Sequence, residues 1–183
     1  IVVRLVGSEM CIRDRLGASI NGDSGFRILS SPVSGQILGS LLTNLWTQGM
    51  TGSDAPEASN ANVWTLNVSG QSWTALTDIS NSGTSLSAGQ GFLVYVFDDT
   101  DYDGTSDLPA IISITGTENS GNATISSVPA NGWVLAGNPY SSTIDWDLVS
   151  DDNSPFGSTA YVWDDATSSV SYTHLTLPTT YHV

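Results

Sequence analysis

The sequence predicts an all-β fold of the antiparallel, sandwich-like kind. Short segments rich in Val, Ile, Thr, Trp and Tyr recur along the chain, and clusters of Gly, Asn, Ser and Pro separate them. Such a succession of short strands and turns is typical of β-sandwiches and barrels. The chain has a single cysteine, so no disulfide framework can hold it together.

We expect the strands, in chain order, at residues 26–33, 62–68, 72–76, 91–97, 110–116, 123–128, 133–138 and 160–165. Ser69 and Gly70 mark the tip of a hairpin, and "ENSGN" (118–122) marks the tip of another. One short helix, packed on a sheet, is predicted within "GQILGSLLTNLW" (35–46), where aliphatic residues recur at helical spacing: Ile37, Leu41, Leu42 and Leu45.

The two ends differ in character from the Gly-, Ser- and Asp-rich sequence between them. A DNA word that encodes Met10–Asp14 has a reverse complement that encodes Val170–His174, and both ends resemble the transposase-end adapters of sequencing libraries. We therefore expect residues 1–15 and 170–183 to be adapter-like artefacts that pack poorly, and we exclude them from fold reasoning.

A repeat indicates two related β units. "GFRILSSPVS", from Gly25, aligns without a gap with "GWVLAGNPYS", from Gly132, at glycine, an aromatic residue, an aliphatic residue, proline and serine. We expect the two stretches to occupy equivalent strands. The predicted organisation is a first β unit at 16–107, a connecting β-hairpin at 108–131 and a second, truncated β unit at 132–169, with the native protein continuing beyond.

Charge excludes several classes of partner. The net charge is −14, and Arg27 is the only basic residue outside the two ends. Nucleic acids and anionic membrane surfaces are bound by clusters of Lys and Arg, so we expect neither partner. No apolar run has the length of a membrane span, so no membrane insertion is expected.

The residue inventory also argues against catalysis. Residues 16–169 contain no His, Cys or Lys, which excludes a serine–histidine triad, a thiol nucleophile, a Schiff base and a P-loop. Asp145 and Asp147 flank Trp146, and paired carboxylates can hydrolyse glycosides. They follow the turn at Asn138–Pro139, however, and we interpret them as turn-capping residues. We expect no catalytic residues and no enzyme activity.

The segment "DDTDYDGTSD" (98–107) predicts a metal site. Asp99, Asp101 and Asp103 alternate before a glycine, and Asp107 follows. Calcium takes several hard oxygen ligands, and such spacing lets one loop wrap the ion. The loop departs from an EF-hand because Ala110 stands at the twelfth position, where a glutamate is usual. The sequence therefore predicts a weak calcium site; the alternative is a solvated acidic loop that discourages edge-to-edge aggregation.

The aromatic residues allow two interpretations. Most tryptophans lie among apolar strand residues, which indicates core packing. A sugar-binding face would instead expose two or three aromatic rings on one sheet, and Trp64 and Trp73 lie across the predicted hairpin. Tyr102, inside the acidic loop, is the best single exposed aromatic residue. Trp73 and Tyr102 are therefore the candidate ligand-binding residues.

Several segments together resemble a known group of proteins. "GFRILSSPVSG", "GQGFLVYVFDD", "GWVLAGNPYSSTIDWD" and "YVWDDATSS" are similar to segments of large secreted and cell-surface proteins of Bacteroidota, just upstream of a C-terminal type IX secretion sorting domain. The resemblance implies export and display at the cell surface. It also implies recognition by the export machinery through a C-terminal domain that this sequence does not contain.

These observations predict a non-catalytic structural or adhesive module of an exported bacterial surface protein, with calcium as a stabilising ion. Its expected partners are extracellular glycans or other surface proteins. The alternative is a carbohydrate-binding module attached to a polysaccharide-degrading enzyme.

Overall fold

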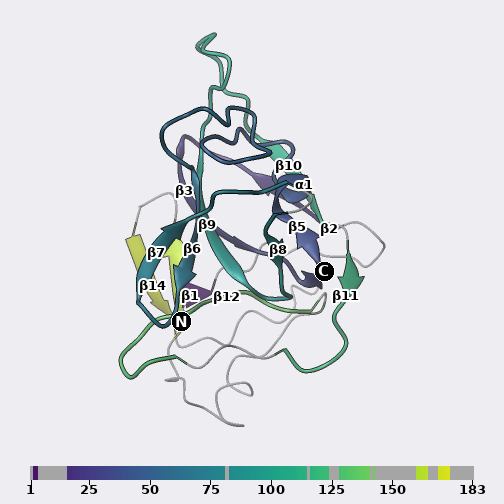
Figure 1. Ribbon diagram of the computed structural model, residues 1–183, viewed down its shortest axis with the longest axis vertical. Coiled ribbons are helices and arrows are strands. Elements are labelled where there is room, and N and C mark those ends of the chain that lie inside the picture. The colour runs from purple at the N-terminus through teal and green to yellow at the C-terminus, as the bar shows by residue number, and fades with distance from the viewer. Residues whose placement is uncertain are drawn as a thin grey trace, which may run out of the picture.

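The computed structural model describes residues 2–3, 16–80, 83–114, 116–123, 128–140, 142, 160–164 and 169–173. Of these, residues 2–3, 16–18, 160–164 and 169–173 are described by their backbone alone. The structure confirms an all-β fold, with several antiparallel sheets and one short helix in this part of the chain (Figure 1).

A four-stranded antiparallel sheet forms the centre of the fold. Its strand order is β3-β9-β6-β7, and its strands are β3 (Gly25–Ser30), β9 (Gly91–Val96), β6 (Val63–Asn67) and β7 (Ser72–Ala75). The predicted hairpin is confirmed, because β6 pairs with β7 from Trp64 opposite Ala75 to Asn67 opposite Ser72. At its turn, the side-chain oxygen of Asn67 accepts a hydrogen bond from the Gly70 N–H at 3.0 Å.

One face of this sheet is buried in the core. Successive strand residues point to opposite faces, so the buried side chains of Phe92, Val94 and Val96 share the inner face with Val63. The hydrophobic core extends from there to residues on β2 (Leu16–Ile20), β10 (Ala110–Ile114) and the helix. Burial of these aliphatic side chains is the main favourable contribution to folding.

Short paired strands complete the described fold. β10 pairs antiparallel with β2, β4 (Val33–Ser34) with β11 (Thr117–Glu118), and β5 (Gln36–Ile37) with β8 (Ser85–Leu86). The hairpin predicted at 108–131 stays a prediction, because most of its second strand lies outside the described residues. The part that is described, β10 and β11, pairs with strands from the first unit instead.

The helix is shorter than predicted. α1 comprises Leu38–Leu41 only and begins after Ile37, which is extended and belongs to β5. Gly39 and Ser40 are poor helix formers, and the helix has no side-chain N-cap. The Gly39 N–H donates to the carbonyl of Ile79 at 2.8 Å, and a Cβ on Gly39 would lie 2.4 Å from that oxygen. Close packing on a loop therefore takes the place of a longer helix.

The two repeated stretches contain strands of different length. Gly25–Pro32 contains the six-residue strand β3, whereas Gly132–Pro139 contains only the two-residue β12 (Leu135–Ala136). Both reach the turn before β9: Gly89 donates its N–H to Ser31 at 2.7 Å and accepts from Gly137 at 2.8 Å. The aligned positions 28–29 and 135–136 both lie in strands, but β3 pairs with β9 whereas β12 pairs with β1 (Val2–Val3), so the equivalence of the two units stays a prediction. Residues 143–159 lie outside the description, so the unit boundaries stay predictions.

Parts of both chain ends pair as strands. β1 (Val2–Val3) lies parallel to β12 and to β13 (Ala160–Asp164), and β13 pairs antiparallel with β14 (Ser169–Thr173). The backbones of β1 and β14 therefore do not show the poor packing expected of the two ends. Strand pairing needs only N–H and C=O groups, so it does not bear on the adapter-like origin of the ends, and Cys11 and His174 are not described.

In the described part of the chain, no helix has the length and apolar character needed to cross a membrane.

Asn62 fastens the long loop between α1 and β6 to the sheet. This residue is 3% exposed. Its side-chain amide donates to the carbonyls of Trp46 and Tyr95, both at 2.9 Å, and its oxygen accepts from the Gln48 N–H at 2.9 Å. One side chain therefore satisfies backbone groups of the loop and of β9.

Replacing Asn62 with alanine should lower the free energy of unfolding by about 2–4 kcal/mol, because buried backbone groups would lose their partners. Asn60→Ala is the matched control, since Asn60 is exposed and should change stability by less than about 0.5 kcal/mol. Urea unfolding of both variants measures the difference. Equal stabilities would show that Asn62 does not hold the loop.

Candidate functional site: the acidic loop

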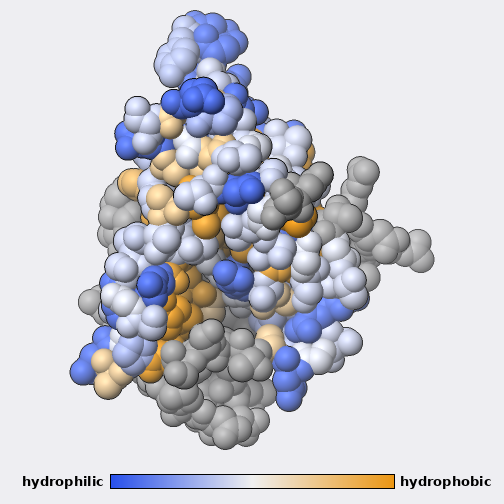
Figure 2. All heavy atoms as spheres, viewed as in Figure 1, coloured by the Kyte–Doolittle hydropathy of each residue, from blue (hydrophilic) through white to orange (hydrophobic). Residues whose placement is uncertain are grey.

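The loop between β9 and β10 projects from the top of the molecule in Figure 1, and in Figure 2 the same projection is coloured as hydrophilic. It contains Asp98 to Asp107. Within it, Tyr102 has a φ of 61° and Gly104 a φ of 83°. Left-handed backbone is uncommon for residues other than glycine, so the loop turns sharply at its tip.

The base of the loop is held to the turn before β3. The Ser24 hydroxyl donates to a carboxylate oxygen of Asp98 and accepts a hydrogen bond from the Asp98 N–H at 2.9 Å. The Asp107 N–H donates to the Asp98 carbonyl, which closes the loop at its neck. Asp98 therefore anchors the loop and does not point into it.

The side chain of Arg27 hydrogen-bonds to the turn before β3. This residue is 5% exposed, and its guanidinium donates to the carbonyls of Asn21 at 3.1 Å and Asp23 at 2.9 Å. Burial lowers the pKa of Arg27, and the neighbouring charge of Asp23 acts in the opposite direction. The single base of residues 16–169 thus supports the segment on which Ser24 lies.

Three of the four predicted calcium ligands converge. Carboxylate oxygens of Asp99, Asp101 and Asp107 lie within 4.8 Å of one another. Because calcium–oxygen distances are about 2.3–2.6 Å, two oxygens bound to one ion are at most about 5 Å apart. The spacing of the three oxygens is therefore compatible with a single shared cation.

Each of these three carboxylates has one oxygen engaged by a loop N–H. Asp99 Oδ2 accepts from Gly104 at 3.0 Å, Asp101 Oδ1 from Asp103 at 3.2 Å, and Asp107 Oδ2 from Thr100 at 2.9 Å. The bonds fix the orientation of the side chains. Asp99 Oδ1, the other oxygen of that carboxylate, is buried and has no hydrogen-bond partner in the described part of the protein. A buried carboxylate oxygen without a partner is costly, which makes it a good ligand for a cation.

The structure does not bring Asp103, the fourth predicted ligand, into this group. Its Oδ1 accepts hydrogen bonds from the hydroxyl and the N–H of Thr105. Asp103 therefore caps the turn at the tip of the loop. The alternation of acids along the sequence does not distinguish a ligand from a capping residue.

Hydroxyl groups lower the pKa of several of these carboxyls. The Ser24 hydroxyl holds the pKa of Asp98 below its usual value, and the Thr105 and Thr100 hydroxyls do the same for Asp103 and Asp107. In each case the hydrogen bond favours the charged form. Sequence reasoning overlooked Ser24, Thr100 and Thr105. The only available signal was that serine and threonine often pair with acids in turns.

The two candidate ligand-binding residues are both exposed but lie apart. Tyr102, at the loop tip, is 89% exposed, and Trp73, on the edge strand β7, is 48% exposed. Trp64 is half-buried on the neighbouring strand, and Trp46 donates its indole N–H to Gln48 at 3.3 Å. Asp145 and Asp147 lie outside the described residues.

No family model, curated protein or solved structure matches this chain.

The carboxyl groups of the loop should make the stability of the folded protein depend on pH. A carboxyl with a lowered pKa stabilises the folded state above its unfolded pKa, about 3.9, and this contribution disappears as the pH falls through the folded pKa. Melting temperatures measured in chelator should therefore change little through these groups from about pH 7 to 5 and fall below about pH 4. Thr100→Val should reduce this fall, because it frees Asp107 from its hydroxyl partner.

Thr74→Val is the matched control, since Thr74 is exposed on β7, away from the loop. It should keep the acid dependence of the parent chain. The hydroxyl of Thr100 has no part in the effect if both valine variants give the same pH profile.

Proposed function

We propose that this chain is a non-catalytic structural or adhesive module of an exported bacterial surface protein, and that calcium holds its acidic loop. Two observations carry the calcium part: the convergence of Asp99, Asp101 and Asp107, and the buried, unpartnered Oδ1 of Asp99. One oxygen of each carboxylate is engaged by a loop N–H, which leaves three oxygens, fewer than the 6–8 that calcium takes, so carbonyl groups or waters would complete the site.

Charge supports a stabilising ion. Five Asp residues lie within residues 98–107, and the one base of residues 16–169, Arg27, is buried and donates to carbonyl groups of the turn before β3. Carboxylates this close repel one another unless salt, protons or a cation screens them. An ion that binds only the folded loop removes the repulsion and stabilises the fold by mass action. Without a bidentate glutamate, the dissociation constant is expected to be on the order of 10⁻⁴–10⁻³ M, as in extracellular modules.

A non-catalytic role agrees with the residue inventory of 16–169, which has no His, Cys or Lys. Export and surface display rest on the resemblance of the repeated segments to Bacteroidota surface proteins. Sequencing the uninterrupted gene tests this part of the proposal. A type IX sorting domain downstream would support surface display, whereas a cytoplasmic enzyme domain in the same reading frame would contradict it.

Calcium should raise the melting temperature of the full chain at fixed ionic strength, by comparison with chelator. A tenfold excess over the dissociation constant corresponds to about 1.4 kcal/mol of added stability. Asp99→Asn and Asp101→Asn should abolish the increase, because each removes a charge from the converging oxygens.

Asp103→Asn is the matched control. It removes the same charge from the same loop but lies outside the converging group, so the calcium-dependent increase should persist. No increase in the parent chain, or equal loss in all three variants, would contradict a specific site and leave a solvated acidic loop.

A further inference from the structure

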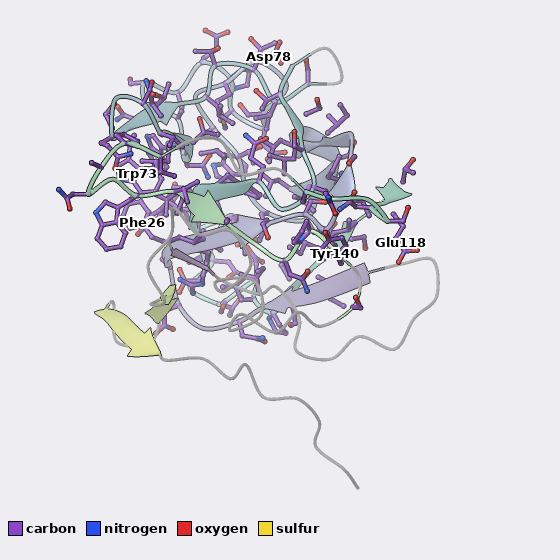
Figure 3. The ribbon with its side chains drawn as sticks, turned by 90° about the horizontal axis from the view of Figure 1, so that it is seen from below. Phe26, Trp73, Asp78, Glu118 and Tyr140 are labelled. Carbon is purple, nitrogen blue, oxygen red and sulfur yellow. The ribbon has the colours of Figure 1, made fainter. Side chains whose placement is uncertain are left out.

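The outer face of the central sheet carries a row of aromatic rings that the calcium loop does not explain. The register places Trp64 beside Leu93 and Phe26 beside Tyr95, and these side chains point away from the core. Trp73 lies opposite Leu66 and shares this face. Phe26 and Trp73 lie on the same side of the molecule in Figure 3. We call Phe26, Trp64, Trp73 and Tyr95 the aromatic face.

Contacts among Phe26, Trp64 and Tyr95 hold three of the four rings of this face in place. The centroids of Phe26 and Trp64 are 5.8 Å apart, and those of Phe26 and Tyr95 are 5.1 Å apart with the rings nearly perpendicular. Side chains held on a rigid antiparallel sheet lose little freedom when a ligand binds. Phe26 is 44% exposed and Trp73 48%, so aromatic surface is available at both ends of the row. Exposed apolar surface of this kind marks binding sites.

The edge of the sheet adds hydrogen-bonding groups. β7 is the last strand in the order β3-β9-β6-β7, and among the described residues it pairs only with β6. Its outer edge therefore presents backbone N–H and C=O groups that no described strand uses. Trp73 lies on this strand, so an aromatic ring and open backbone groups occur together.

Charge decides which ligand this surface accepts. The register places ten residues of the four strands on this face, of which Ile28, Ser30 and Gly91 are buried, and none of the ten is charged: Phe26, Ile28, Ser30, Gly91, Leu93, Tyr95, Trp64, Leu66, Trp73 and Ala75. The chain as a whole has a net charge of −14. Nucleic acids and acidic polysaccharides are repelled by such a chain, and two copies of it repel each other.

We propose that the aromatic face binds a neutral polysaccharide. Pyranose rings present apolar C–H faces that stack on aromatic rings, and hydroxyl groups at their edges that hydrogen-bond to polar groups. An uncharged chain of such rings matches the exposed rings of Phe26 and Trp73 and the open edge of β7, and is not repelled by the acidic surface. The proposal is independent of calcium binding, since the aromatic face and the acidic loop share no residue.

Isothermal titration of the full chain tests this proposal with three soluble neutral polysaccharides, a β-glucan, a xylan and a mannan, and with polygalacturonate as the anionic comparison. At least one neutral polysaccharide should bind saturably, and polygalacturonate should not bind. Trp73→Ala and Phe26→Ala should each weaken binding about tenfold, the loss expected for one aromatic stacking contact. Trp73→Phe should retain part of the affinity because it keeps a ring.

Tyr102→Ala is the matched control, because Tyr102 is 89% exposed, more than any other described aromatic residue, yet lies outside the aromatic face. It should bind like the parent chain. The melting temperature of each variant separates a binding defect from unfolding. The proposal is wrong if none of the neutral polysaccharides binds, or if polygalacturonate binds equally well. It is also wrong if Trp73→Ala and Phe26→Ala both keep the parent affinity, or if Tyr102→Ala alone loses affinity.

Discussion

The antiparallel pairing of β3 with β9 is the interaction on which the rest of the structure depends. It places Phe26 beside Tyr95 on the outer face and turns Phe92 into the core. A slip of one residue would exchange the two sets of side chains. The same pairing brings Ser24, just before β3, to Asp98, just after β9, and so fixes the base of the acidic loop. The core, the aromatic face and the loop are therefore set by one register.

An acidic chain can fold in this way because its charges stay out of the core. The acidic loop projects from the molecule (Figure 1), and the one base of residues 16–169, Arg27, is buried and satisfied by carbonyl groups of the turn beside it. A buried charge is tolerated only when such hydrogen bonds replace its lost hydration. The loop and the aromatic face can thus serve separate roles without disturbing the aliphatic core between the sheet and α1.

Patterns that depend on neighbouring residues were predictable. The strands around Trp64 and Trp73, their hairpin and the strand at 91–97 follow from alternating side chains and turn residues, and the structure has them at nearly the predicted bounds. The helix was predicted too long, and the second repeated stretch has a shorter strand than the first, because contacts with distant segments outweigh local pattern. Gly39 packs against Ile79, and Gly137 bonds to Gly89.

The sequence by itself determined the all-β class, the acidic surface and the grouping of Asp residues in one loop, because these depend on composition and short-range spacing. Only the tertiary structure decided which acids converge, since Asp99, Asp101 and Asp107 come together through hydrogen bonds across the loop while Asp103 caps a turn. It also decided that Phe26 joins Trp64 on a partly exposed face. Strand alternation assigns residues to two faces, but only the packing of the other elements decides which face is buried.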